Sequence, residues 1–483
     1  MSLAAPAETG AAPDPSITST TPRQAQRTSD RLKALFLLSL GAILIVSLGN
    51  LFDPIVRYDD YPALFAEPEG FWGKTLSEGR WLNYVWHLRG VVTPSWLNFV
   101  AFQAVWALLC AALATLAFPG SGRMWFAGLA ALTMLVSPQT TMIAPWFNTL
   151  LPGMMVVTLY ALLALALPQR SLRLLLPPFT VAAFMAYTTL PLILVLTCLL
   201  ATRERSFKDC VGLCALFVGS FALALVCVYS LNWHVHGVFG VELDISRDPN
   251  LAEGLAGLMA NMTHVAETFR ELMHRTSFEF WPMAWYHLAL LAGATVIVAR
   301  HDRLEALYLW AALAMGLGLC VVQAMKFGVG VPMRAFIFAW LVYAILIVRA
   351  AERLSATAGL SGRIARNAVL LVTLSYLLQT GNQWLVFRGW QSETRAVAAN
   401  LQGGSGPIYV VGDVLSYPTA VEAGIQHPLG LEGRLRLLTG RPVILCATSP
   451  VTCASAGMPD VVPTSVTAMT PARLSGQDAI LFP

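Results

Sequence analysis

The sequence predicts an all-α polytopic membrane protein of about eleven transmembrane helices that ends in a small α/β domain. Of the 483 residues, 56% are hydrophobic and only 12% are charged, whereas an ordinary soluble domain carries roughly 25% charged residues. Long apolar runs recur between residues 32 and 383. After residue 384 they give way to short strand-like segments separated by turns.

Residues 1–30 are rich in Ala, Pro, Ser and Thr, and they contain neither an aromatic residue nor an apolar core. We therefore expect a disordered tail and not a cleaved signal peptide. Basic residues lie just before or at the start of the first apolar run, which predicts a cytoplasmic N-terminus by the positive-inside rule. They are Arg23, Arg27, Arg31 and Lys33.

Residues 31–383 carry the expected membrane module. Several of its apolar runs are shorter than the roughly 20 residues that a straight crossing needs, and the two runs around Pro191 could also form one long broken helix. Basic residues flank this pair on both sides, which favours two short helices with both outer ends in the cytoplasm. The expected spans are 32–50, 95–117, 124–137, 149–167, 174–187, 190–202, 209–230, 283–299, 304–322, 332–348 and 365–383.

Charge predicts the orientation of the module. Arginines occupy the short loops that we place in the cytoplasm, whereas acidic residues gather in the opposite loops, 51–94 and 231–282. Eleven crossings then put residues 384–483 outside the cytoplasm, which is the periplasm if the protein lies in a bacterial inner membrane. The acidic residues are Asp53, Asp59, Asp60, Glu67, Glu69, Glu78, Glu242, Asp244, Asp248 and Glu253.

Loop 231–282 is too long to be a simple connector. Apolar residues recur at helical spacing from Leu251 to Leu272, so we expect an amphipathic helix on the membrane surface or over a cavity.

The C-terminal region contains three short apolar segments bounded by turn residues, which predict a domain of about 100 residues with a buried sheet. Cys446 and Cys453 lie in this region. A disulfide between them is expected only in an oxidising compartment, and the sequence leaves their pairing open. The expected strands are Pro407–Asp413, Arg441–Cys446 and Asp478–Phe482.

Two adjacent carboxylates, Asp59 and Asp60, follow the first apolar run. A carboxylate close to an acceptor hydroxyl can serve as a general base, although a solvated acidic turn is the simpler alternative. The segment behind them is amphipathic and suits the membrane interface. One face carries Trp81, Tyr84, Val85 and Leu88, and another carries Arg80, Asn83 and His87.

The motifs R-Y-D-D at residues 57–60 and G-R-W-L-N-Y at residues 79–84 resemble those of the GT-C superfamily. These are polyprenyl-phosphate-sugar-dependent glycosyltransferases, and the motifs are similar to those of bacterial transferases that modify lipopolysaccharide O-antigen or a related surface glycan. The resemblance implies an inverting transfer on the outer face of the membrane, with one carboxylate of the first outer loop as the base. It points to Asp59 or Asp60 without choosing between them, and it implies an enzyme without a metal or other cofactor.

The donor phosphate needs cations, for which we nominate Arg80, Lys326 and Arg334. Arg334 follows Pro332 at the start of an apolar helix, and the free N–H groups of such a helix start favour an anion. The alternatives are an arginine that contacts lipid headgroups or one that pairs with the carboxylates of the first loop.

Further polar and aromatic residues near the outer ends of the helices are candidates for contacts with substrate. Ordinary packing at the membrane interface is the alternative for each of them. His234 and His236 have the spacing of a zinc pair but lack an evident third ligand, so no metal site is expected. The substrate-binding candidates are Arg57, Tyr58, Trp81, Asn83, His87, Asn148, His234 and His236.

The expected partners are a polyprenyl-phosphate-linked sugar donor, a glycan or glycolipid acceptor and membrane lipid. The net charge of +4 is spread among the loops, so the sequence gives no support for binding nucleic acid. An O-antigen polymerase or ligase is an alternative function, but it would not need the acidic pair. A flippase or transporter of lipid-linked glycans is another, but it would carry charges inside its spans.

Overall fold

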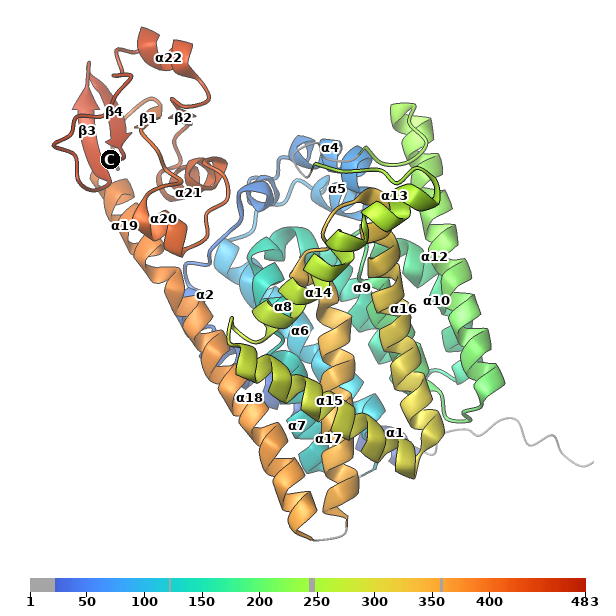
Figure 1. Cartoon of the computed structure of the whole chain (residues 1–483). Helices are drawn as coiled ribbons and strands as arrows, with labels where there is room; N and C mark the ends of the chain where they lie inside the picture. The colour runs from blue at the N-terminus through green and yellow to red at the C-terminus, as the bar shows by residue number, and fades with distance from the viewer. Residues whose placement is uncertain (1–21, 121–122, 243–247, 357–358) are drawn as a thin grey trace, which may run out of the picture.

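The computed structural model of the chain is a bundle of helices that carries a small C-terminal domain at one end (Figure 1). We call this end of the bundle the upper end and the opposite end the lower end. The predictions for residues 1–21, for the side chain of Arg23 and for Asp244 fall outside the described residues. The structure describes residues 22–120, 123–242, 248–356 and 359–483.

Six helical segments among the described residues are long and apolar enough to cross a membrane, so the chain is a membrane-embedded protein. Helix α17 lies almost entirely inside the bundle, whereas α12 and α15 expose most of their apolar surface. The segments are Ser95–Ala117 (α6), Pro138–Ala166 (α8 Pro138–Ile143, η3 Ala144–Trp146 and α9 Phe147–Ala166), Phe207–His236 (α12), Trp281–His301 (α15), Arg303–Phe327 (α16) and Met333–Ser355 (η5 Met333–Phe336 and α17 Ile337–Ser355).

The other five expected spans are also helical. Residues 22–30 belong to the first of these helices, so the prediction of a tail up to residue 30 is wrong for them. The amphiphilic sequence ahead of the apolar run simply continues the helix, because it contains no glycine or proline after Pro22. The helices are Pro22–Val46 (α1), Met124–Leu135 (α7), Gln169–Phe184 (α10), Pro191–Ala201 (α11) and Leu360–Val386 (α18).

Two separate helices, and not one broken helix, surround Pro191. Helices α10 and α11 pack against each other. The Arg173 guanidinium at the start of α10 contacts the Thr202 hydroxyl at the end of α11, at 3.3 Å. Both outer flanks of the pair therefore lie at the same end of the bundle, as the flanking basic residues predicted.

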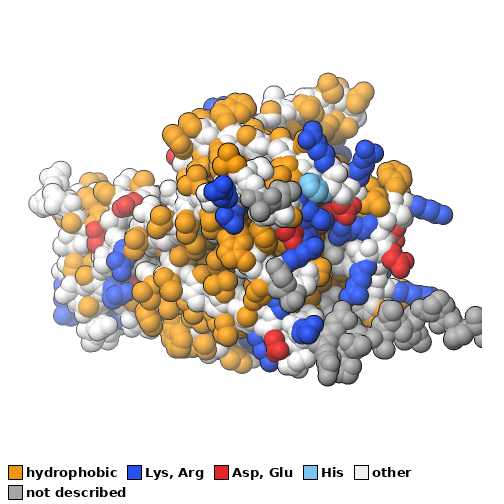
Figure 2. Space-filling view, turned by 90° about the horizontal axis from the view of Figure 1, so that it is seen from below, with side chains coloured by type: hydrophobic (Ala, Val, Ile, Leu, Met, Phe, Trp, Pro, Cys, Tyr) orange, Lys and Arg blue, Asp and Glu red, His pale blue; other side chains and the backbone are white. Residues whose placement is uncertain are grey.

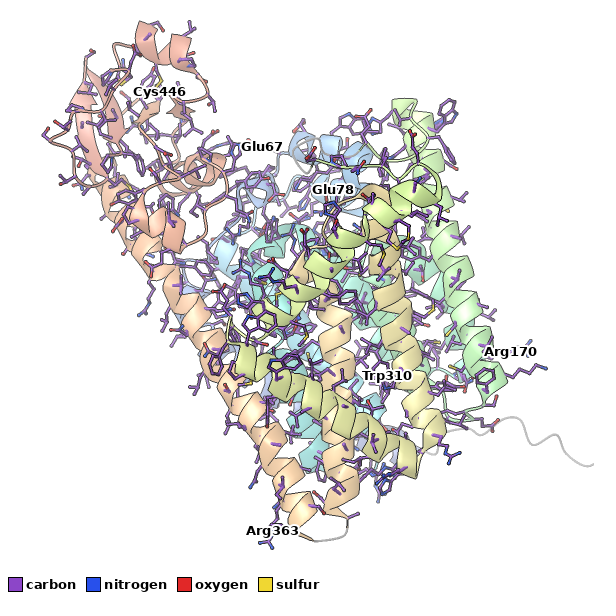
Figure 3. The ribbon with its side chains drawn as sticks, in the orientation of Figure 1. Glu67, Glu78, Arg170, Trp310, Arg363 and Cys446 are labelled. Carbon is purple, nitrogen blue, oxygen red and sulfur yellow. A yellow bond between two sulfur atoms is a disulfide. The ribbon has the colours of Figure 1, made fainter. Side chains whose placement is uncertain are left out.

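Ion pairs join the basic loops at the lower end. Arg173 pairs with Asp209 at 2.6 Å, and Arg349 pairs with the buried Glu305 at 2.7 Å. Figure 2 shows the lower end, where Lys and Arg side chains gather over part of the surface. In Figure 3, Arg170 and Arg363 lie at this end, whereas Glu67 and Glu78 lie at the upper end.

Short helices cover the upper end of the bundle. The amphipathic helix expected in the large loop divides at Asn261 into α13 and α14, with Val265 buried and with Leu255 and Met259 exposed. Its apolar stripe therefore faces the protein only in its second half. The upper helices are Leu48–Leu51 (α2), Tyr58–Asp60 (η1), Tyr61–Leu64 (α3), Glu69–Glu78 (α4), Trp81–His87 (α5), Gly254–Ala260 (α13) and Met262–Thr276 (α14).

The C-terminal domain, residues 388–483, contains a four-stranded sheet in the order β2-β1-β4-β3. The three predicted strands are present, with β1 parallel to both β2 and β4. Strand β3 was missed because Pro471 interrupts its pattern, and such a residue is tolerated at this sheet edge. The elements are Arg388–Asn400 (α19), Ile408–Val411 (β1), Pro418–Glu422 (α20), Leu429–Thr439 (α21), Val443–Leu445 (β2), Pro450–Ser455 (α22), Thr470–Leu474 (β3) and Gln477–Leu481 (β4).

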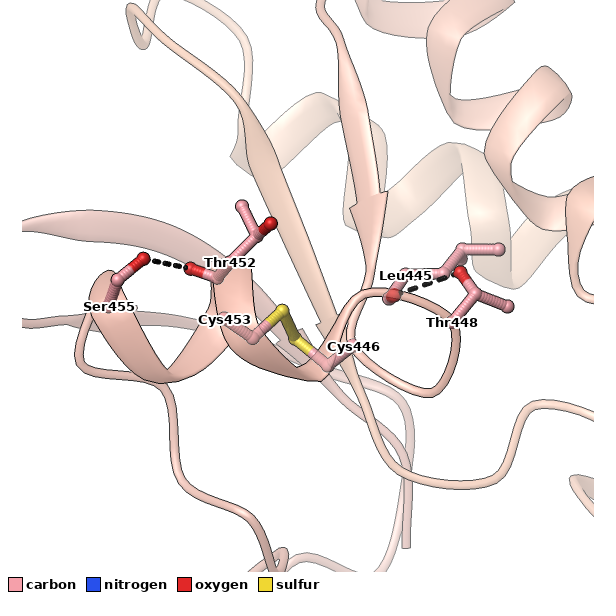
Figure 4. The surroundings of a disulfide bond; sticks show 6 residues. All are labelled: Leu445, Cys446, Thr448, Thr452, Cys453 and Ser455. Carbon is pink, nitrogen blue, oxygen red and sulfur yellow. Dashed lines mark hydrogen bonds between the residues drawn. A yellow bond between two sulfur atoms is a disulfide. The ribbon is translucent and has the colours of Figure 1, made fainter.

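A disulfide joins Cys446, just after β2, to Cys453 in α22 (Figure 4). It ties the short helix to the edge of the sheet and answers the question that the sequence left open. The six other cysteines are free and are buried or half-buried in the helical bundle.

Candidate active site

The Asp60 carboxylate is completely buried and caps the start of helix α9. It accepts hydrogen bonds from the backbone N–H groups of Asn148 at 3.0 Å and Thr149 at 2.7 Å, and also from both of their side chains. A carboxylate at a helix N-terminus satisfies orphan N–H donors and faces the positive end of the helix dipole. Asp60 therefore fixes the loop of residues 51–94 to α9 and is closed to any substrate.

Burial raises the pKa of Asp60 to about 6, although the hydrogen bonds from Thr149 and Asn148 oppose the rise. The group is still mainly ionised at neutral pH. Its role in the described structure is that of a structural anion, so Asp60 is no longer a candidate for the base.

Asp59 lies in a different environment, with 21% of its side chain exposed. Its carboxylate forms an ion pair with Lys74 and accepts a hydrogen bond from the Trp146 indole at 2.5 Å. Burial disfavours the charge, but Lys74, the indole N–H and the nearby Arg80 together hold the pKa below its ordinary value. Asp59 is thus an ionised, partly accessible carboxylate.

Two arginines lie over the Trp146 ring. The guanidinium carbon of Arg57 is 5.4 Å from the ring centroid, and that of Arg334 is 4.8 Å away. Burial lowers the pKa of Arg57, and the like charge of Arg334 lowers it further. The same indole therefore contacts the Asp59 carboxylate through its N–H and two cations through its ring.

A cavity of about 440 Å³ lies beside this cluster, between helices α10, α12 and α16. All three residues nominated for the donor phosphate line its upper part: Arg80, Lys326 and Arg334. The exposed Val322, with 61% of its surface accessible, also lines the cavity and shows that it opens sideways from the bundle. The apolar wall comprises Phe184, Leu192, Phe221, Leu225, Tyr229, Leu319, Val322 and Phe327.

The three cations differ in how they are compensated. Arg80 pairs with Glu78, and its guanidinium lies 5.2 Å from the Tyr187 ring centroid. The Lys326 ammonium donates to the Ala252 carbonyl at 3.1 Å. Within the described residues, neither Lys326 nor Arg334 forms an ion pair with a carboxylate. The cavity therefore presents net positive charge next to an apolar wall.

The Trp81, Asn83 and His87 side chains of α5 point into the protein and not toward the cavity, contrary to the prediction that they contact substrate. The Trp81 indole donates to Asn232 at 2.7 Å, and the Asn83 amide donates to the Ala186 carbonyl at 3.0 Å. His87 is buried with its ring centroid 4.4 Å from that of Phe71, and burial together with Arg89 lowers its pKa to about 3. These three side chains are engaged in packing.

Four more substrate-binding candidates are engaged by other protein groups or are exposed. The Asn148 amide is shared between Asp60 and Asn98, which donates to it at 2.7 Å, so it has no free polar atom. His236 contacts the Thr75 hydroxyl at 2.8 Å, whereas His234 is exposed. Tyr58 stacks on His427 of the C-terminal domain, with ring centroids 5.1 Å apart. Of the eight candidates, only Arg57 lies at the cluster around Trp146.

Lys74 was not among the predicted site residues, because no local pattern links it to Asp59, 15 positions away. Helix α3 and the loop after it bring the two side chains together. The contact between Trp146 and Asp59 could not be predicted either, because the two residues are 87 positions apart. Within the described residues, no three His, Cys, Asp or Glu side chains gather as metal ligands would. Neither a protein-family model nor a curated protein sequence matches this chain.

Proposed function

We propose that the chain is a membrane-embedded glycosyltransferase that moves a sugar from a polyprenyl-phosphate donor to a cell-surface glycan. One observation carries the proposal. Arg80, Lys326 and Arg334 line the upper part of one apolar cavity that opens at the side of the bundle. Arg334 lies over the Trp146 ring, and the Trp146 indole donates a hydrogen bond to Asp59. A phosphate carried by a hydrocarbon chain has the same two parts, an anion and an apolar tail.

The groups present suit an inverting displacement. The ionised Asp59 takes the proton from the acceptor hydroxyl, and the hydroxyl oxygen attacks the anomeric carbon as its bond to the phosphate oxygen breaks. Arg334 and Lys326 stabilise the negative charge that the departing phosphate gains. Asp60 keeps the loop in place and does not exchange a proton with substrate.

The topology that we propose has all eleven helical segments crossing a bacterial inner membrane. The upper end is then periplasmic, and the N-terminus and the lower end are cytoplasmic. The basic residues at the lower end support this orientation, and so does the Cys446–Cys453 disulfide at the upper end, since disulfides persist in oxidising compartments. The GT-C assignment itself rests on the acidic motif and the G-R-W segment.

The direct test is transfer by the purified protein in lipid nanodiscs. A radiolabelled sugar on polyprenyl phosphate should pass to glycan extracted from a strain that lacks this protein. The glycan of that strain should lack one sugar substituent by mass spectrometry. An unaltered glycan, together with no transfer by the purified protein, would contradict the proposal.

An Arg334→Ala substitution is expected to weaken donor binding. Losing a charged contact to phosphate should raise the KM for the donor about tenfold to a hundredfold, while the KM for the acceptor changes little. Arg334→Lys keeps the charge and should retain part of the affinity, and the exposed Arg363 at the lower end provides the control Arg363→Ala. Equal increases in the KM values of donor and acceptor would show that Arg334 has a structural role instead.

Lys74→Met is expected to shift the pH dependence of turnover. Because Lys74 helps to lower the pKa of Asp59, its loss should raise that pKa, and the acid limb of kcat should move up by about one pH unit. Turnover at pH 8 should change much less, since Asp59 is ionised there in both proteins. Lys208→Met at the lower end is the control, and an unmoved acid limb would show that Asp59 is not the titrating base.

A further inference from the structure

The segment that carries Asp59 is held on both sides by the C-terminal domain. We infer that this domain braces the first outer loop, and that Asp53 and Arg434 are positioning residues for the candidate base. The inference rests on the proposed function for its catalytic meaning. The brace itself is a structural property that can be measured without any activity.

On the N-terminal side of Asp59, the main contact with the C-terminal domain is made by the Arg434 guanidinium. Only 1% of its side chain is exposed, and it binds both carboxylate oxygens of Asp53, at 3.0 and 2.8 Å. Arg395 also pairs with this carboxylate. Burial disfavours the Asp53 charge, but the two arginines hold its pKa below the ordinary value. A bidentate pair of this kind fixes direction as well as distance.

The same arginine is tied into α19. It donates to the Thr394 hydroxyl at 2.5 Å and to the Gln391 carbonyl at 3.0 Å. The Gln391 amide then donates to Asn50 at 2.8 Å and to the Asp53 carbonyl at 2.5 Å. The chain that leaves the first transmembrane segment is thus hydrogen-bonded to two helices of the C-terminal domain.

Contacts immediately before Asp59 and beyond it complete the brace. Arg57 donates to the Gly424 carbonyl, and Tyr58 stacks on His427. The Tyr61 ring lies so close to Gly433 that a Cβ there would approach Tyr61 Cγ to 2.3 Å. Further along, Arg436 pairs with Glu67 at 2.5 Å.

Asp59 stands between these contacts but makes none itself. Its carboxylate contacts Lys74 and Trp146, both of which lie in the membrane module. The C-terminal domain therefore fixes the backbone on either side of Asp59 and leaves its carboxylate directed at the cluster around Trp146. A displacement of about 1 Å can lower a rate a hundredfold, so such a brace matters for a base.

Hydrogen exchange of the full-length protein in nanodiscs tests the brace. In Asp53→Asn, the amides of residues 57–61 are expected to exchange about tenfold faster or more. The backbone N–H groups of Arg57 and Asp60, which donate to Pro145 and Arg57 carbonyls, report directly on this turn. Arg395→Ala removes the exposed partner of Asp53 and should give a smaller increase.

Arg441→Gln is the matched control. Arg441 pairs with Asp478 at 2.8 Å inside the C-terminal domain and does not contact the first loop. Its loss should loosen the domain and leave residues 57–61 protected. Unchanged protection of these residues in folded Asp53→Asn, or equal loss in Arg441→Gln, would overturn the brace. If Asp53→Asn does not fold, Arg395→Ala decides in the same way.

Kinetics then connect the brace to catalysis. Asp53→Asn should lower kcat about a hundredfold with the KM for the donor unchanged. Adding Arg434→Gln should cost little more, because the two residues act as one unit. If exchange responds as expected but the wild-type protein transfers no sugar, the brace stands and the proposed function fails. If the wild-type protein transfers sugar but exchange does not respond, the brace fails alone.

Discussion

Asp59→Asn is expected to abolish most sugar transfer and to leave the protein folded. The amide cannot accept a proton, so kcat should fall by about 10²- to 10⁴-fold, which is the usual contribution of a general base. The fold should survive, because the Asp59 side chain is partly exposed and its partners Lys74 and Trp146 are partly exposed as well. Transfer from the polyprenyl-phosphate donor at saturating substrate is the measurement.

The acidic neighbours supply the control for this experiment. Glu69 is acidic and lies in the same loop, but its side chain is exposed and is not part of the brace. Glu69→Gln should retain most of the turnover, since substitutions at exposed positions usually have little effect. Near-normal turnover by Asp59→Asn would remove the base from the proposed mechanism, whatever the donor turns out to be.

Asp60→Ala, unlike Asp59→Asn, is expected to destabilise the fold. It leaves the backbone N–H groups of Asn148 and Thr149 buried without acceptors, and each such donor costs about 1 to 3 kcal/mol. The start of α9 also loses its cap. The measurement is the unfolding midpoint in detergent, which should fall by several degrees or more.

Asp413→Ala is the matched control for Asp60. The Asp413 carboxylate also accepts backbone hydrogen bonds, from Leu415 at 2.9 Å and Ser416 at 3.4 Å, but it is exposed. Water replaces the lost acceptor there, so the midpoint should hardly move. A fully stable Asp60→Ala protein that has lost transfer would reverse the roles that we give the two aspartates.

The sequence predicted the helical bundle, the basic loops at one end and the three cations that line the cavity. Those features depend on residue type and on position relative to helix ends, which a sequence shows directly. Arg80 and Arg334 are 254 positions apart, yet each lies at the upper end of an apolar or interfacial helix, so their convergence followed from topology. The count of eleven crossings stays a prediction, because six segments among the described residues are long and apolar enough on their own.

The roles of the two aspartates could not be predicted. Asp59 and Asp60 are adjacent and chemically identical, and their difference comes from partners far along the chain, Trp146 for one and Asn148 with Thr149 for the other. The packing of α5 was missed for a related reason. Its polar face was expected to contact water or substrate. Instead, Asn83 donates to the Ala186 carbonyl and His87 stacks on Phe71 inside the protein.

Helices α18 and α19 meet with little interruption of the backbone. Phe387, between them, keeps right-handed helical angles, with φ −75° and ψ −13°. A nearly continuous helical rod of this kind holds the sheet at a nearly constant distance from the helical bundle (Figure 1). A domain mounted in this way has little freedom to swing, which keeps Arg434 within reach of Asp53.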